Sequence, residues 1–133
     1  MFASTRRLLV AAAALLLLQL GCGVTETTVA GGLPDHDPEL AYRLVNQEHA
    51  LLLDVRTSRE YLSGHVPGAK NIDVQELPDR LNEVEALVGG KKDRPIVVYC
   101  TRGVRAAQAK RILLRAGYEK VTNLGGLYDW PSK

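Results

Sequence analysis

The pattern of hydrophobic and polar positions divides the chain into a start dominated by one apolar run, a polar connecting stretch and a longer part where apolar runs alternate with periodic segments. Two runs, at 50–55 and 96–99, are almost continuously apolar, as expected for strands buried on both faces of a sheet. Shorter runs at 71–73 and 120–124 predict two further strands. A brief fifth strand is expected at 27–30, within the connecting stretch.

Between these runs, apolar residues recur every three or four positions, which predicts amphipathic helices. The first is expected to be capped by Asp37, with Pro38 at its first position. Ser58 is expected to cap a short second helix, and longer helices are predicted at 77–88 and 104–116. Strands alternating with helices predict an α/β fold, with a mostly parallel central sheet of about five strands and helices on both faces.

The start of the chain has the layout of a secretory signal peptide. Arg6 and Arg7 precede an uninterrupted apolar run from Leu8 to Leu18. That run is too short to span a bilayer as a helix, which takes about 20 residues. The protein is therefore expected to be exported and to be periplasmic, or membrane-anchored and facing the periplasm. We expect a signal peptide at 1–22, a tether at 23–34 and a single folded domain at 35–133.

The end of the signal segment resembles a bacterial lipobox, in which a cysteine is lipidated and becomes the first mature residue. Gly21 before Cys22 fits that pattern, whereas Gln19 stands where leucine is usual. Lipidation of Cys22 stays open at this stage, and a single acyl-type anchor there would tether the domain to a membrane surface. The two arginines also loosely resemble a twin-arginine signal, so the export route stays open as well.

Composition and charge exclude several classes of function. Arg6 and Arg7 account for the whole formal charge of +2, so the exported chain would be nearly neutral. A near-neutral domain with 5% aromatic residues makes a poor nucleic-acid binder, so no such partner is expected. Three scattered histidines and one mature thiol lack the spacing of metal ligands. No nucleotide-binding pattern is present either, so no cofactor is expected.

Candidate chemistry is concentrated where the second continuous apolar run ends, at Cys100. In α/β sheets the reactive site lies at the carboxyl ends of the strands. The unpaired N–H groups of the helix predicted from Val104 favour an anion, and therefore favour a thiolate over a thiol. Gly103 allows a sharp turn, and Arg102 and Arg105 add two positive charges. The loop is therefore expected to hold a sulfur nucleophile beside an anionic substrate.

This loop resembles the active-site loop of the rhodanese family, whose usual pattern is Cys-x-x-Gly-x-Arg-Ser/Ala. Here the pattern is met by Cys100, Gly103, Arg105 and Ala106. The similarity extends from about Pro38 to Trp130, and the chain resembles the small periplasmic rhodaneses, including the phage-shock type, in particular. The other family motifs occur in the expected order: Asp54-Val55-Arg56 with Glu60-Tyr61, Gly64 to Ala69 with Asn71-Ile72, and Gly117-Tyr118 with Gly125-Gly126 and Trp130.

The resemblance implies a thiosulfate sulfurtransferase. In that family, a thiolate takes the outer sulfur of a small anionic donor such as thiosulfate, and a thiophilic acceptor, cyanide or a thiol, removes it from the resulting persulfide. Cys100 would be the catalytic nucleophile. The residues implied to bind the substrate are Thr101, Arg102, Gly103, Val104 and Arg105. Those expected to support the structure, because charged groups at strand ends normally pair, are Asp54, Arg56 and Glu60.

Three other functions are weighed against this one. Cysteine-based phosphatases and arsenate reductases have Cys-x5-Arg loops, whereas Arg105 follows Cys100 after four residues. A thiol–disulfide enzyme usually has Cys-x-x-Cys, and position 103 is Gly. A binding or sulfur-delivery module with a protein partner would share the fold, and retention of the cysteine with both arginines favours activity instead. The expected activity is therefore sulfur transfer through a persulfide on Cys100.

Overall fold

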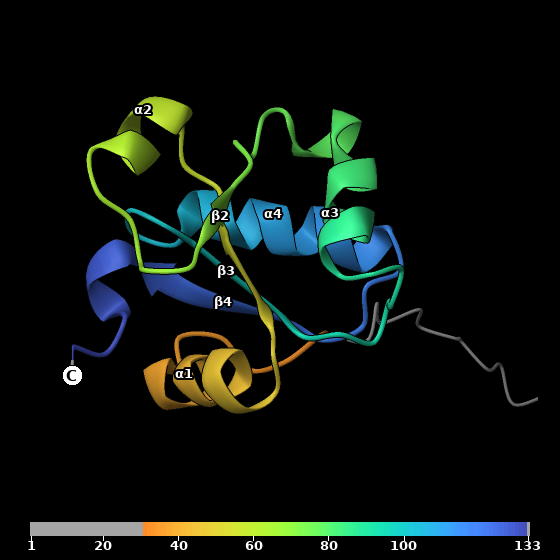
Figure 1. The fold of residues 1–133 in the computed structure, drawn as a ribbon, viewed down its shortest axis with the longest axis horizontal. Helices are drawn as coiled ribbons and strands as arrows, with labels where there is room; N and C mark the ends of the chain where they lie inside the picture. The colour runs from red at the N-terminus through yellow and green to blue at the C-terminus, as the bar shows by residue number, and fades with distance from the viewer. Residues whose placement is uncertain (1–30, 133) are drawn as a thin grey trace, which may run out of the picture.

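The computed structural model describes residues 31–132, in which four parallel strands form one sheet with the order β2-β1-β3-β4 (Figure 1). The strands are β1 (Leu51–Asp54), β2 (Lys70–Asn71), β3 (Ile96–Cys100) and β4 (Val121–Gly126). The helices are α1 (Pro38–Gln47), α2 (Ser58–Leu62), α3 (Leu81–Leu87) and α4 (Val104–Arg115), with short 3-10 helices η1 (Leu77–Asp79) and η2 (Leu127–Asp129). The predicted α/β fold with a parallel sheet is confirmed.

Three expectations fall outside the described residues. These are the signal peptide at 1–22, the lipidated Cys22 and the short strand at 27–30. Within residues 31–132, no helix is both long enough and apolar enough to cross a bilayer.

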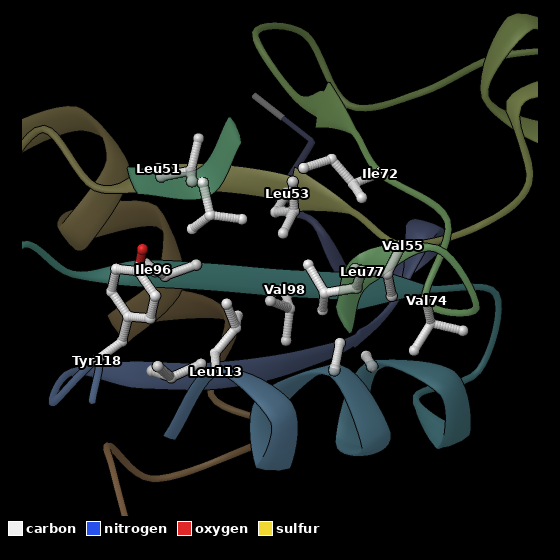
Figure 2. Close-up of a cluster of buried hydrophobic side chains, with 14 of the residues drawn as sticks. Leu51, Leu53, Val55, Ile72, Val74, Leu77, Ile96, Val98, Leu113 and Tyr118 are labelled. Carbon is white, nitrogen blue, oxygen red and sulfur yellow. The ribbon is translucent and has the colours of Figure 1, made fainter. Parts of the chain in front are cut away.

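The two faces of the sheet are covered by different helices, because successive side chains of a strand point to opposite sides. Leu53 and Val98 pack on the side of α3 and α4, whereas Leu52 and Val97 pack on the side of α1. Figure 2 shows the first of these cores, where Leu113 of α4 lies beneath the sheet. Burial on both faces explains why β1 and β3 read as nearly continuous apolar runs.

One helix cap differs from the prediction. Asp37 caps α1 as expected, but Thr57 rather than Ser58 caps α2. The Thr57 hydroxyl accepts the Glu60 N–H at 3.2 Å, and the Glu60 carboxylate accepts the Thr57 N–H at 2.9 Å. Only Thr57 stands three residues before Glu60, the spacing at which this reciprocal pair of hydrogen bonds can form. The cap therefore fixes Glu60 in the first turn of α2.

The helix predicted at 77–88 is also interrupted. Its first residues form η1, and α3 begins only after Arg80, whose backbone leaves the helical region with φ −120° and ψ 22°. The side chain of Arg80 spans the interruption by pairing with Glu76 at 2.9 Å and Glu83 at 2.7 Å. By contrast, α4 occupies the predicted range except for its last residue.

Residues 31–37 lie along the outer edge of β4. The Leu33 N–H donates to the Val121 carbonyl at 2.9 Å, and the His36 N–H donates to the Asn123 carbonyl at 2.8 Å. An edge strand otherwise exposes unpaired backbone groups, so this segment, which we call the N-terminal strap, covers that edge. Leu33 falls in the range assigned to the tether from the sequence, yet it is hydrogen-bonded to the sheet.

Candidate active site

Cys100 ends β3, a central strand of the sheet, and its side chain packs on the α4 side. The residue is 2% exposed, and its Sγ accepts the Gly103 N–H at 2.9 Å. Gly103 precedes α4 with φ +107°, in the left-handed region that favours glycine. A hydrogen bond to the charged form stabilises it, so this geometry favours a sulfur anion at the beginning of α4.

An open pocket lies beside Cys100 at the carboxyl ends of the strands. Of the residues expected to bind substrate, Gly103 is buried and contributes its backbone, while the others surround the pocket with their side chains. Glu60, which was expected to support the structure, reaches the pocket from α2. The lining residues are Glu60, Cys100, Thr101, Arg102, Val104 and Arg105.

Arg105 is held by Glu60 in a two-point ion pair. Nη1 and Nη2 of Arg105 donate to Glu60 at 2.7 and 3.0 Å, and Nη2 also donates to the Thr101 hydroxyl at 3.0 Å. The hydrogen bond from Arg105, followed by that from the Thr57 N–H, lowers the pKa of Glu60 to about 2. The same pair raises the pKa of Arg105. The positive charge of Arg105 is therefore largely matched, and α2 is tied to the loop.

Arg102 has a different environment from Arg105, although both belong to the same loop. Its side chain is exposed and lines the pocket. Within the described part of the chain, no ion pair or hydrogen bond engages its guanidinium. Its positive charge is therefore available to an anion that enters the pocket.

Asp54 and Arg56 form a buried brace at the end of β1. Nη2 of Arg56 donates to Asp54 at 2.7 Å and to the Gly64 carbonyl at 2.7 Å. The hydrogen bond with Asp54 raises the pKa of Arg56, so the guanidinium stays charged within this pair. The Asn71 amide donates to the carbonyls of both residues, at 3.0 and 2.9 Å. Neither Asp54 nor Arg56 lines the pocket.

One contribution from β4 to the loop was not predicted from the sequence. Gly126 lies so close to the loop that a Cβ there would overlap the Thr101 carbonyl oxygen. Asn123, buried in β4, donates its amide N–H to the Gly103 carbonyl at 3.0 Å. The glycine pair at 125–126 was recognised as a motif, whereas nothing local marks Asn123. The one feature that could have indicated its role is the presence of a side-chain amide within a strand that is buried along its whole length.

A second hollow of residues 31–132 lies at the opposite end, where β1 and β3 begin. Its lining includes Glu48, His49 and Arg94 but neither cysteine nor serine. Arg94 donates to the His49 carbonyl at 2.7 Å and to the Leu87 carbonyl at 2.9 Å, and so joins two connecting segments. The hollow therefore offers no thiol or serine hydroxyl as a nucleophile, in contrast to the pocket beside Cys100.

Comparisons with known proteins agree with this arrangement. Residues 37–133 match the family model described as a rhodanese-like domain. A sulfurtransferase of Allochromatium vinosum is 38% identical over 92 residues, which covers 68% of this chain and 80% of that protein. A tRNA uridine(34) hydroxylase of Bacillus cereus is 37% identical over 93 residues, 68% of this chain but only 28% of that protein. The human single-domain sulfurtransferase TSTD1 is similar in structure, with a TM-score of 0.58 and 32% identity over 74% of this chain and 91% of that one.

The ion pair of Glu60 predicts a pH-dependent contribution to stability. Since its pKa of about 2 lies below the usual 4.5, the unfolded chain takes up the proton first as the pH falls. The stabilisation is thus complete above pH 4.5 and is lost as the pH approaches 2. Glu60→Gln should lower the unfolding free energy at neutral pH by about 1 kcal/mol at most, because the pair is partly exposed. Thermal melts of both proteins across this range should converge in acid, and a constant gap would contradict the assignment.

Proposed function

The chain belongs to the rhodanese-like domain family, and from this membership we propose that it transfers sulfane sulfur through a persulfide on Cys100. The observation that carries the proposal is the hydrogen bond from the Gly103 N–H to the Cys100 sulfur, beside a pocket with an unpaired arginine. This combination suits a sulfur anion that must accept an atom from another anion. The sulfurtransferase among its relatives supports the same activity.

The proposed reaction has two displacement steps and requires no oxidant. The Cys100 thiolate attacks the outer sulfur of thiosulfate, the sulfur–sulfur bond of thiosulfate breaks, and its electron pair leaves with sulfite. Cys100 then carries a persulfide anion. Cyanide or a thiolate attacks the terminal sulfur of that persulfide, forming thiocyanate or a new persulfide. The electron pair of the broken bond returns to Cys100 as the thiolate.

The residues around Cys100 have different roles in this reaction. The Gly103 N–H and the first turn of α4 stabilise the sulfur anion before the attack and after it. Arg102 binds the sulfonate group of the donor, because its charge is unmatched. Arg105 is committed to Glu60 and Thr101, so it shapes the pocket more than it binds the donor. This division differs from the expectation that Arg102 and Arg105 both bind the donor.

We also propose that the protein is exported and works in the periplasm, either free or tethered through a lipidated Cys22. The support is the arrangement of charged, apolar and small residues in 1–22. Mass spectrometry of the protein isolated from cells should show a mature chain without the first 21 or 22 residues. A chain that still begins at Met1 would overturn this proposal.

Sulfur loading gives the direct test of Cys100. After incubation with thiosulfate, the intact mass of the wild type should increase by one sulfur atom, and cyanide should remove that atom as thiocyanate. Cys100→Ser should gain nothing, because a hydroxyl group cannot carry the persulfide. An unmodified wild type would contradict the proposal and favour a binding module. Rapid hydrolysis of a phosphate ester in the same preparation would favour a phosphatase.

The two arginine environments predict different effects on donor binding. Arg102→Ala should raise the KM for thiosulfate about tenfold, since it removes a hydrogen bond to a charged group, and should leave the melting temperature unchanged. Arg111→Ala is the matched control, because Arg111 is exposed on α4 and does not line the pocket. Steady-state kinetics with thiosulfate measure both variants. Equal KM values for the two would remove Arg102 from the proposed site.

A further inference from the structure

We propose that Asn123 is a positioning residue that holds the Gly103 carbonyl, so that the Gly103 N–H points at the Cys100 sulfur. The proposal rests on the function proposed for Cys100 and deepens it, because Asn123 lies on β4 and outside the loop. Its side chain is 1% exposed and does not line the pocket. Its amide Nδ2 donates to the Gly103 carbonyl at 3.0 Å, and its Oδ1 accepts the Gly125 N–H at 2.8 Å.

An amide is required at this position because the pairing of β3 with β4 is irregular. Val98 pairs with Asn123, but the next residue, Tyr99, pairs with Gly125, so Leu124 is an extra residue. Such a bulge takes backbone groups out of the ladder of the sheet. Oδ1 of Asn123 satisfies one of them, the Gly125 N–H, while Nδ2 remains free to reach the loop. Serine and threonine also donate and accept, but through a single oxygen, whereas an amide carries its donor and its acceptor on two separate atoms.

Gly103 is the residue that most needs such a restraint. It has no Cβ, so its backbone can rotate more freely than that of any other residue in the loop. Its carbonyl is held by Asn123 and by the Ala107 N–H at 2.9 Å, while its own N–H meets Cys100. A Cβ on Gly103 would lie 3.2 Å from the Gly125 Cα, so the loop packs tightly on β4. Holding the Gly103 carbonyl in place therefore also restricts the direction in which the Gly103 N–H points.

Asn123 is itself anchored from its other side by the N-terminal strap. Its N–H donates to the Asp35 carboxylate at 2.9 Å, and its carbonyl accepts the His36 N–H at 2.8 Å. Asp35 is held in turn by Lys110 at 2.6 Å. The strap, β4 and the loop are thus connected by one set of hydrogen bonds. Because the backbone of Asn123 is held in place, its side chain can in turn hold Gly103 in place.

The test is the rate at which iodoacetamide alkylates Cys100 as a function of pH, followed on the Cys100 peptide by mass spectrometry. Asn123→Ala should slow alkylation at neutral pH about tenfold and move the profile to higher pH, because the sulfur anion loses a well-aligned donor. Thr122→Val is the matched control. It removes a neighbouring, partly buried hydrogen bond, from the Thr122 hydroxyl to the Pro34 carbonyl at 2.6 Å, which does not involve the loop. Its profile should match that of the wild type.

Each outcome bears on the proposal. If the profiles of Asn123→Ala and Thr122→Val coincide, Asn123 does not position the loop. If Asn123→Ala fails to fold by circular dichroism, Asn123→Ser decides, because serine keeps an oxygen near Gly125 but is too short to reach Gly103. Should both Asn123 variants unfold while Thr122→Val folds, Asn123 serves the fold alone and the proposal is overturned. Alkylation uses no sulfur donor, so a wild type that fails to load sulfur would count against the proposed function only.

Discussion

The Gly103 N–H and the Cys100 sulfur meet at the end of a fully buried strand, and several separate elements maintain that contact. β3 delivers the sulfur, and the start of α4 supplies the donor. α2 fixes the side of the loop near Arg105 through Glu60, and β4 fixes the opposite side through Asn123. A buried sulfur anion is costly unless donors face it, so the geometry of a short turn decides whether the site can work. The rigid sheet beneath that turn supplies its position.

Much of this arrangement could be predicted because its causes are local. Continuous apolar runs indicated β1 and β3, and a cysteine placed after such a run with a helix behind it indicated the candidate nucleophile and the position of the pocket. The remaining features depend on residues that are distant along the chain. Glu60 and Arg105 are brought together only by the fold, and Asn123 reaches Gly103 only because β4 contains a bulge. The cap of α2 was predicted at Ser58, one residue after its position at Thr57, since both residues carry a hydroxyl group that could fill that role.

The two loop arginines show how the fold separates residues that look equivalent in the sequence. Arg105 points to a carboxylate that its own chain provides, whereas Arg102 is exposed and unmatched. An arginine that is already paired orients its neighbours at fixed geometry, while an unpaired one attracts diffusing anions. The pocket therefore contains a negative side chain without becoming repulsive to an anionic donor. The same pairing keeps the Thr101 hydroxyl in a defined place.

The N-terminal strap has a consequence for how this protein can be shortened. The family match begins at residue 37, so a domain cut at that boundary would lack the strap. Its β4 would then present an uncovered edge, which is a template for aggregation between molecules. The lost segment also contains Asp35, which holds the backbone of Asn123. A truncation chosen from family boundaries alone would therefore favour aggregation, and it would also remove the residue that holds Asn123 behind the Cys100 loop.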